Sequence, residues 1–288
     1  MTTMRFSNHK TADAAAPKKL TRIATAHESQ LPMFQPSRRP ATIVKRHHET
    51  AFGSITVSGK LGQGHRDLLD ALLLHREKKH FKDGGRLSVL VDPYQIRKAI
   101  SAGRTPLPYN YIHKLLEDMR QARVEMIWDD GKQHHRMTEG IIALFEEASS
   151  KPVTHGTCNF AHRDDDGGDS DRRAMLKVTF SKAMTYLLRD DQNIHYKLAP
   201  IVSLTHGLSQ AIARYCLSHT SVHETFEGIC ARVGFDTGSK NPSAARKAKM
   251  ELLIDAAALA ALGVEVKENG SVHHTGSRGD RVTHIPGK

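Results

Sequence analysis

Cysteine is scarce in this sequence. Its three cysteines, Cys158, Cys216 and Cys230, are an odd number, and no two of them lie close together in the chain. A disulfide framework needs an even set of cysteines, and a structural zinc site usually needs a Cys-x-x-Cys pair, which is absent here. This usage is typical of a reducing compartment, so we expect a cytoplasmic protein without disulfides.

Long apolar runs are missing as well. No stretch approaches the roughly 20 apolar residues that span a bilayer, and no signal-type apolar segment stands at the N-terminus. We therefore expect no membrane partner. Hydrophobic residues make up 39% of the 288 residues, a modest share that predicts globular units with polar tails. The length is sufficient for two domains.

Motifs that carry catalytic chemistry are also absent. Residues 59–64 are rich in glycine but lack the Gly-Lys-Ser/Thr ending of a phosphate-binding loop, and there is no Gly-x-Ser-x-Gly elbow. The 19 histidines include adjacent pairs such as His47 and His48, whose side chains point to opposite sides of an extended backbone and chelate poorly. We predict that the protein is not an enzyme and binds no metal or other cofactor.

What the chain does have is positive charge. Lys and Arg number 42 against 31 Asp and Glu, which gives a net charge of +11. A surplus of this size favours a polyanionic partner, and double-stranded DNA is the partner that we predict.

Two polar segments divide the chain. Residues 1–50 contain nine Lys or Arg against three Asp or Glu and show no sustained periodicity, so we predict a flexible basic arm. Residues 151–173 are poor in large apolar side chains and rich in aspartate, and we predict an acidic linker. A calcium loop starting at Asp164 is not favoured, because its twelfth position is Met175 rather than Glu. The predicted domains are therefore residues 51–150 and 174–288.

Residues 222–263 have the pattern of a helix-turn-helix. The first helix is predicted to end at Gly234 and to bury Phe226, Ile229, Cys230 and Val233, which recur at helical spacing. Asn241 and Pro242 predict the start of the second helix. Its expected apolar stripe comprises Met250, Leu253, Ile254, Ala257, Ala258 and Ala261. In such units the start of the second helix meets the base edges of DNA.

A hairpin is predicted after this second helix. Residues 264–266 form its first strand, Asn269 and Gly270 its turn, and residues 281–285 its returning strand. Helix 204–217, the helix-turn-helix and this hairpin follow each other in the order of a winged helix. Helix 62–78, a helix pair over 93–121 and a hairpin over 123–145 repeat that order. We therefore predict an α+β fold of two tandem winged-helix domains with a disordered basic N-terminal arm.

A short peptide stands out within the arm. Gln30, Leu31, Pro32, Met33 and Phe34 resemble the bacterial sliding-clamp-binding motif, usually Gln-Leu-Ser/Asp-Leu-Phe, with departures at Pro32 and Met33. The glutamine would bond backbone groups at the rim of a pocket, while the three apolar side chains would fill its subsites. The predicted clamp-binding residues are thus Gln30, Leu31, Met33 and Phe34.

Taken together, the chain resembles the iteron-binding plasmid replication initiators of the tandem winged-helix type, such as the TrfA, RepA and RepC initiators. The resemblance is carried by residues 52–59 (FGSITVSG) with the leucine-rich helix that follows, and by residues 204–266. It implies initiation of plasmid DNA replication through binding to repeated origin sites, and recruitment of host proteins such as the sliding clamp and helicase. It also implies a homodimer formed through the first domain.

The candidate DNA-binding residues follow from the two predicted elements of the second domain. They are Ser239, Lys240, Asn241, Ser243, Arg246, Lys247 and Lys249 around the second helix, and Lys267, Arg278 and Arg281 on the wing. Arg or Lys pairs with guanine and Asn with adenine, whereas wing contacts to phosphate add affinity without specificity. The equivalent positions of the first domain are Tyr109, Asn110, His113 and Lys114, where packing or dimer contacts are an equal alternative.

Other interpretations remain open at this point. The basic helix face is also compatible with a merely solvated surface. A winged-helix transcriptional repressor would use the same DNA-binding residues, but it would have no use for a clamp peptide. A nuclease or relaxase would need an attacking tyrosine beside a histidine cluster, and Tyr109 and Tyr111 have only His113 nearby.

Overall fold

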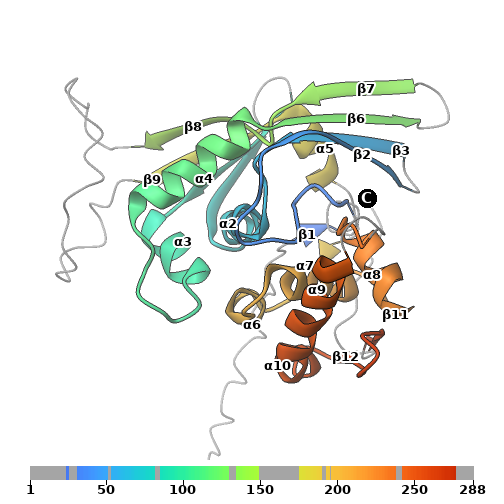
Figure 1. Cartoon of the computed structure of the whole chain (residues 1–288). Helices are drawn as coiled ribbons and strands as arrows, with labels where there is room; N and C mark the ends of the chain where they lie inside the picture. The colour runs from blue at the N-terminus through green and yellow to red at the C-terminus, as the bar shows by residue number, and fades with distance from the viewer. Residues whose placement is uncertain are drawn as a thin grey trace, which may run out of the picture.

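The computed structural model shows a mixed α+β protein (Figure 1), as the sequence predicts. It describes residues 24–25, 31–50, 53–81, 85–129, 134–148, 175–189, 193–194, 196–237 and 242–276. Two hydrophobic cores define an N-terminal domain, residues 31–194, and a C-terminal domain, residues 196–276. Helix α6 (Leu198–Ser203) lies at the boundary, because Leu198 packs in the first core and Ile201 in the second.

One antiparallel sheet of the N-terminal domain has the strand order β2-β3-β6-β7. Its strands are β2 (Ile43–Thr50), β3 (Gly53–Gly59), β6 (Arg123–Asp129) and β7 (His134–Glu139). Alternate side chains of the two central strands, among them Ile55, Val57 and Val124, are buried, as expected for strands with one face on a core. The hairpin predicted over residues 123–145 is confirmed as far as residue 139, because β6 pairs with β7. Residues 142–148 do not continue it, because they pair in the second sheet.

A second antiparallel sheet has the order β4-β5-β9-β8. Its strands are β4 (Arg76–Phe81), β5 (Leu87–Val91), β9 (Met175–Phe180) and β8 (Ile142–Ala148). The chain passes from the first sheet to the second at Gly140, where an added Cβ would lie 2.5 Å from the carbonyl oxygen of Arg120. The hydroxyls of Ser88 and Thr179 lie 2.9 Å apart across two central strands, which satisfies both buried groups.

Four helices pack with these sheets: α2 (Gln63–Leu74), α3 (Pro93–Ile100), α4 (Tyr109–Gln121) and α5 (Lys182–Arg189). Helix α2 is central, and its Leu68, Leu69 and Leu72 are fully buried. Helix α3 begins where the Asp92 carboxylate accepts the N–H of Tyr94 at 2.8 Å. The short strands β1 (Ala24–Thr25) and β10 (Asn193–Ile194) pair with each other.

Two predicted boundaries are wrong. Residues 31–50 do not belong to a flexible arm, because β2 pairs along β3 and the side chains of residues 31, 33 and 34 are buried. The second domain does not begin at residue 174, because β9 lies between β5 and β8 and α5 packs in the first core. The predicted acidic linker, residues 151–173, lies outside the described residues.

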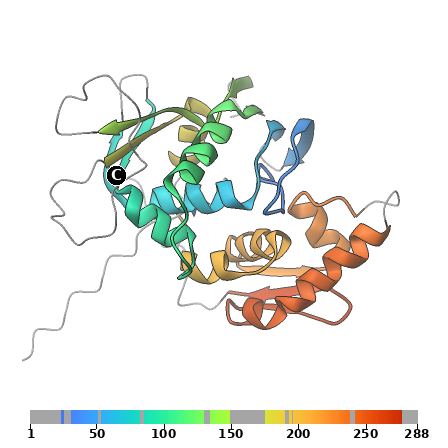
Figure 2. The ribbon, with the colours of Figure 1, turned by 60° about the vertical axis from the view of Figure 1, so that its left-hand side comes forward.

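The C-terminal domain combines helices with a small sheet of order β11-β13-β12. In chain order its further elements are α7 (Gly207–Leu217), β11 (Ser221–Glu224), α8 (Phe226–Arg232), α9 (Pro242–Ile254), α10 (Ala256–Ala260), β12 (Val264–Val266) and β13 (Val272–Thr275). The face predicted for the first helix of the pair is confirmed, since Phe226, Ile229, Cys230 and Val233 are all buried. Figure 2 shows α7 facing the N-terminal domain, with α9 beyond it.

The predicted hairpin exists but is shorter than expected. Its turn is at Asn269 and Gly270, as predicted, with Gly270 at a φ of +85° and the Asn269 side chain accepting the N–H of Ser271. The returning strand is residues 272–275, not 281–285, because Val272 pairs directly with Val266. Residues 281–285 lie outside the described part of the chain.

Candidate nucleic-acid interface

Helix α9 presents one face to the core and the opposite face to solvent. Ala248 and Leu252, four residues apart, are buried, and Ser243, Arg246 and Lys247 are exposed. The helix has no acidic residue in its first turn. Its one carboxylate is Glu251, with an oxygen 3.9 Å from the Lys247 ammonium nitrogen. An exposed pair at this distance is weak, so the start of α9 offers positive charge to an approaching anion.

The expected apolar stripe of this helix is wrong in register. Met250 and Ile254 are 56% and 65% exposed, whereas Leu252 is fully buried. The stripe assumed one continuous helix to residue 261, but α9 ends at Ile254 and a new helix begins after Asp255. The Asp255 carboxylate accepts the N–H groups of Thr205 at 3.1 Å and His206 at 2.9 Å, which fixes this break against the start of α7.

The turn of the β12–β13 hairpin lies against α8 and α9. A Cβ added at Gly270 would come within 3.2 Å of Phe226 and 3.3 Å of the Lys249 Cε, so both neighbours would have to shift, and the φ of +85° also favours glycine. The hairpin and Lys249 are therefore neighbours. The described part of the hairpin is not basic, however, because Lys267 is accompanied by the exposed Glu265 and Glu268.

The predicted DNA-binding residues are only partly within the described chain. The structure brings four of them onto one helix, namely Ser243, Arg246, Lys247 and Lys249, with Lys267 on the adjoining hairpin. Ser239, Lys240, Asn241, Arg278 and Arg281 lie outside the described residues, as does Gln30 of the predicted clamp peptide. Their predicted roles stay predictions.

Helix α4 of the N-terminal domain, predicted to be the equivalent of α9, is engaged in packing at two of its four candidate positions. The Arg97 guanidinium lies 4.1 Å from the centroid of the Tyr109 ring, and the His113 ring meets Phe145 edge-on with centroids 5.0 Å apart. Asn110 and Lys114 are exposed. These contacts favour the packing alternative for Tyr109 and His113.

The peptide predicted to bind a sliding clamp is part of the protein's own core. Leu31, Met33 and Phe34 are 8%, 1% and 5% exposed. The Arg66 guanidinium lies 5.7 Å from the Phe34 ring centroid, and the Arg46 guanidinium donates to the carbonyl of Pro32 at 2.7 Å. These apolar side chains cannot fill a partner's pocket while they occupy this position.

A buried charge cluster between the domains was missed by sequence reasoning. Arg214 of α7 donates to Asp70 at 2.9 Å, to Gln63 at 2.8 Å and to Asp67 at 2.5 Å, all three on α2. Burial would lower the pKa of the Arg214 guanidinium, but the carboxylates of Asp70 and Asp67 outweigh it, so its pKa lies above the usual value. One sequence signal was available. Asp67 and Asp70 lie among the leucines of α2, and a carboxylate on a buried helix needs a charged partner.

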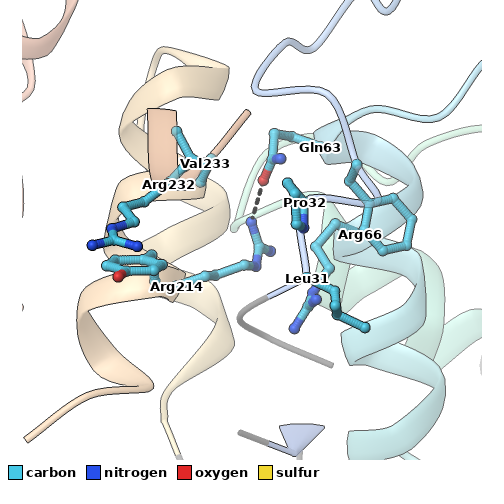
Figure 3. A pocket seen from close by; sticks show the side chains of 10 residues that line it. Leu31, Pro32, Gln63, Arg66, Arg214, Arg232 and Val233 are labelled. Carbon is cyan, nitrogen blue, oxygen red and sulfur yellow. Dashed lines mark hydrogen bonds between the residues drawn. The ribbon is translucent and has the colours of Figure 1, made fainter. Parts of the chain in front are cut away.

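Residues 31–46 also contact the C-terminal domain at this junction. Arg46 also donates to the carbonyl of Gly234 at 3.2 Å, and Arg38 donates to the carbonyl of Val202 at 2.7 Å. Figure 3 shows Leu31 and Pro32 beside Arg66 and Gln63, with Arg214 reaching from the opposite side. The cavity they line has a volume of about 30 Å³, which is room for little more than a water molecule. We therefore regard it as part of the junction rather than as a ligand site.

The described residues contain no helix long and apolar enough to cross a membrane. In the same part of the chain, no three His, Cys, Asp or Glu side chains gather in a way that could hold a metal ion. Burial raises the pKa of the thiols of Cys216 and Cys230 to about 12, so both stay protonated at neutral pH.

No protein-family model matches the chain, and no curated protein matches its sequence. Among solved structures, the chain is similar to the crystal structure of domain 2 and domain 3 of RctB, with a TM-score of 0.50 and 10% sequence identity over 87% of this chain and 97% of that chain. A second crystal structure of RctB domains 2–3 covers 84% of this chain and 92% of that chain at 10% identity, with a TM-score of 0.45. At this identity the likeness is one of fold.

Proposed function

We propose that this protein is a DNA replication initiator that binds duplex DNA sequence-specifically through its C-terminal domain. The observation that carries the proposal is the arrangement of that domain. Helix α7, strand β11, helices α8 and α9, and the hairpin β12–β13 follow in the order of a winged helix, with β13 between β11 and β12. In this fold the second helix of the pair enters the major groove, and here that helix is α9.

The chemistry of α9 supports the same role. Arg246 and Lys247 extend from its solvent face, where guanidinium and ammonium groups can donate to guanine or phosphate. The net charge of +11 adds long-range attraction to a polyanion. The sequence resemblance to plasmid initiators and the shared fold with RctB domains 2 and 3 point to initiation rather than to DNA binding alone.

The finer parts of the proposal concern the rest of the chain. In the N-terminal domain, α2, α3 and α4 precede the hairpin β6–β7, and we include this domain as a second winged-helix unit whose hairpin has been extended by β3 and β2. The protein would bind repeated origin sites of a plasmid and recruit the sliding clamp and the helicase of the host. A homodimer would form through the N-terminal domain.

One observation keeps a transcriptional repressor as a second candidate. The clamp peptide was the feature that separated an initiator from a repressor, and its described residues are buried. A test plasmid whose sole candidate origin is the set of sites that this protein binds would distinguish the two. An initiator supports autonomous replication of that plasmid, whereas a repressor changes only transcription from the bound site.

DNA recognition itself is tested by selecting binding sites from a random duplex pool with the wild type and with Arg246→Ala/Lys247→Ala. We expect enrichment of one tandemly repeatable motif of roughly two helical turns, lost in the variant. Arg246→Ala alone should cost about 1–3 kcal/mol of binding free energy on the selected site and little on random DNA.

A charge-matched control removes two exposed basic residues of the N-terminal domain, Lys60→Ala/Arg104→Ala. This variant should still enrich the same motif. If the wild type enriches no motif and its binding merely fades as salt rises, the protein is a nonspecific basic binder and the proposal is wrong.

A further inference from the structure

The solvent face of α9 is not uniformly polar. Ser243, Arg246, Met250 and Ile254 follow at intervals of three or four residues, so they share one side of the helix. Met250 and Ile254 are 56% and 65% exposed, and they are two of only six exposed large hydrophobic side chains among the described residues. On this face two exposed apolar side chains follow the basic Arg246, which matches a surface that is anionic at one point and apolar at the next.

We infer that Met250 contacts the C5-methyl group of a thymine in the major groove and so determines the sequence that α9 recognises; this inference rests on the proposed function. The thymine methyl is the one apolar group on the base edges of that groove, and it is read by apolar side chains. Methionine suits such a contact because its unbranched, polarizable side chain adapts to the surface it meets.

The position of Met250 along the helix makes the inference geometrically specific. It follows Arg246 by four residues, about 6 Å along the axis. Base pairs rise by about 3.4 Å, so with α9 lying along the groove the thymine lies about two base pairs from the phosphate or guanine that Arg246 contacts. Ile254 is one further turn away, at the point where Asp255 ends the helix.

Charge favours DNA over a second copy of this chain as the occupant of the face. Two copies packed through this face with parallel helices would bring their Arg246 and Lys247 side chains together, and like charges repel. An antiparallel packing centred on Met250 would place each Arg246 guanidinium against the apolar Ile254 of the other copy, without an anionic partner. DNA instead offers phosphates and guanine acceptors to these side chains, while the apolar part of the face reaches the thymine methyl.

The test replaces each thymine of the selected site by deoxyuridine, which removes only the methyl group, and measures affinity for the wild type and Met250→Ala. We expect one or two substitutions to weaken the wild type about three- to tenfold, the scale of one buried methyl group. The same substitutions should leave Met250→Ala unchanged, and Met250→Leu should regain the sensitivity. Leu144→Ala, which removes a 47% exposed side chain of the N-terminal domain, should behave as the wild type.

Each alternative outcome is distinct. If the site is selected and bound but the deoxyuridine series affects the wild type and Met250→Ala equally, the inference is overturned and the proposed function stands. If Met250→Ala changes the sedimenting mass of the free protein instead, the face is an interface between copies and the inference is also overturned. If the wild type shows no sequence preference, both fail.

Discussion

The guanidinium of Arg214 in the C-terminal domain donates through Nε to a carboxylate oxygen of Asp70 in the N-terminal domain, at 2.9 Å. The two side chains are 4% and 0% exposed. The Tyr196 hydroxyl and the Arg66 Nε also donate to the Asp70 carboxylate, at 2.9 Å and 3.0 Å. This buried ion pair links the two domains. If either side chain is removed, the other charge stays buried without water or its partner, which destabilises the folded state.

We therefore predict that Arg214→Ala lowers the free energy of unfolding by about 3–5 kcal/mol, because it leaves the buried Asp67 without the guanidinium that binds it and leaves Asp70 with Arg66 as its charged partner. Denaturant unfolding measures this. Arg120→Ala serves as the control, since its partner Glu117 is on the same exposed helix face and the pair contributes little. A loss no greater for Arg214→Ala than for Arg120→Ala would contradict the proposed importance of the junction.

A second prediction concerns the pH dependence of stability at His48. Burial, the Arg46 charge and His47 lower the pKa of His48 from 6.5 to about 4. In the unfolded chain the imidazole titrates near its usual pKa, so between pH 6.5 and 4 the unfolded state binds more protons than the folded state. Stability contributed by the neutral ring is thus complete above pH 6.5 and is lost as the pH falls through this window.

We expect the melting temperature of the wild type to fall as the pH is lowered from 6.5 to 4, and that of His48→Gln to fall less steeply. His223→Gln is the control, because this exposed ring on β11 lies in the C-terminal domain and is not among the groups that lower the pKa of His48. Equal slopes for His48→Gln and the wild type would show that other groups carry the acid sensitivity.

Local elements of the fold were predictable because their causes are local. The helix at residues 109–121 and the buried face of α8 follow from apolar spacing, and the Asn269-Gly270 turn from backbone preferences. Assignments that depend on distant partners failed. Residues 175–180 have the alternating pattern of a strand, but this pattern does not indicate that the neighbouring strands are β5 and β8.

The candidate site shows the same division. Arg246 and Lys247 were identified because a basic helix start needs no tertiary information. Met250 was assigned to the core because the helix break at Asp255 depends on hydrogen bonds from Thr205 and His206, some 50 residues earlier in the chain. Likewise, a Leu-Pro-Met-Phe segment satisfies a clamp pocket and a protein core equally well, and only the fold decides between them.

A third prediction separates these two uses of the segment. Because Phe34 is buried in the first core, Phe34→Ala should lower the free energy of unfolding by about 3–5 kcal/mol. Val44→Ala, an exposed position in β2, is the control and should change stability by less than about 0.5 kcal/mol. A Phe34→Ala protein as stable as the wild type would mean that the segment is not held in the core.

The same segment gives a binding test. A synthetic peptide of residues 28–36 should bind a bacterial sliding clamp more tightly than the full chain does, because the full chain must first release three apolar side chains from its core. Fluorescence anisotropy with the two ligands in competition measures the difference. Binding of both ligands with equal affinity would mean that releasing the segment from the core costs no free energy. The segment would then be accessible to the clamp in the folded protein.

The last prediction concerns the hairpin. Lys267 and Glu268 are exposed side chains of opposite charge at its turn, beside Lys249 of α9. If the turn lies along a DNA backbone, Lys267→Ala should weaken binding to specific and random duplexes alike and reduce the slope of log affinity against log salt by about 1. Glu268→Gln removes a charge that repels phosphate, so it should strengthen binding to both duplexes.

Titrations at several salt concentrations measure both effects. Because the two variants change charge in opposite directions at adjacent positions, a turn far from the DNA predicts no effect from either, and a specific base contact by Lys267 predicts a loss confined to the selected site.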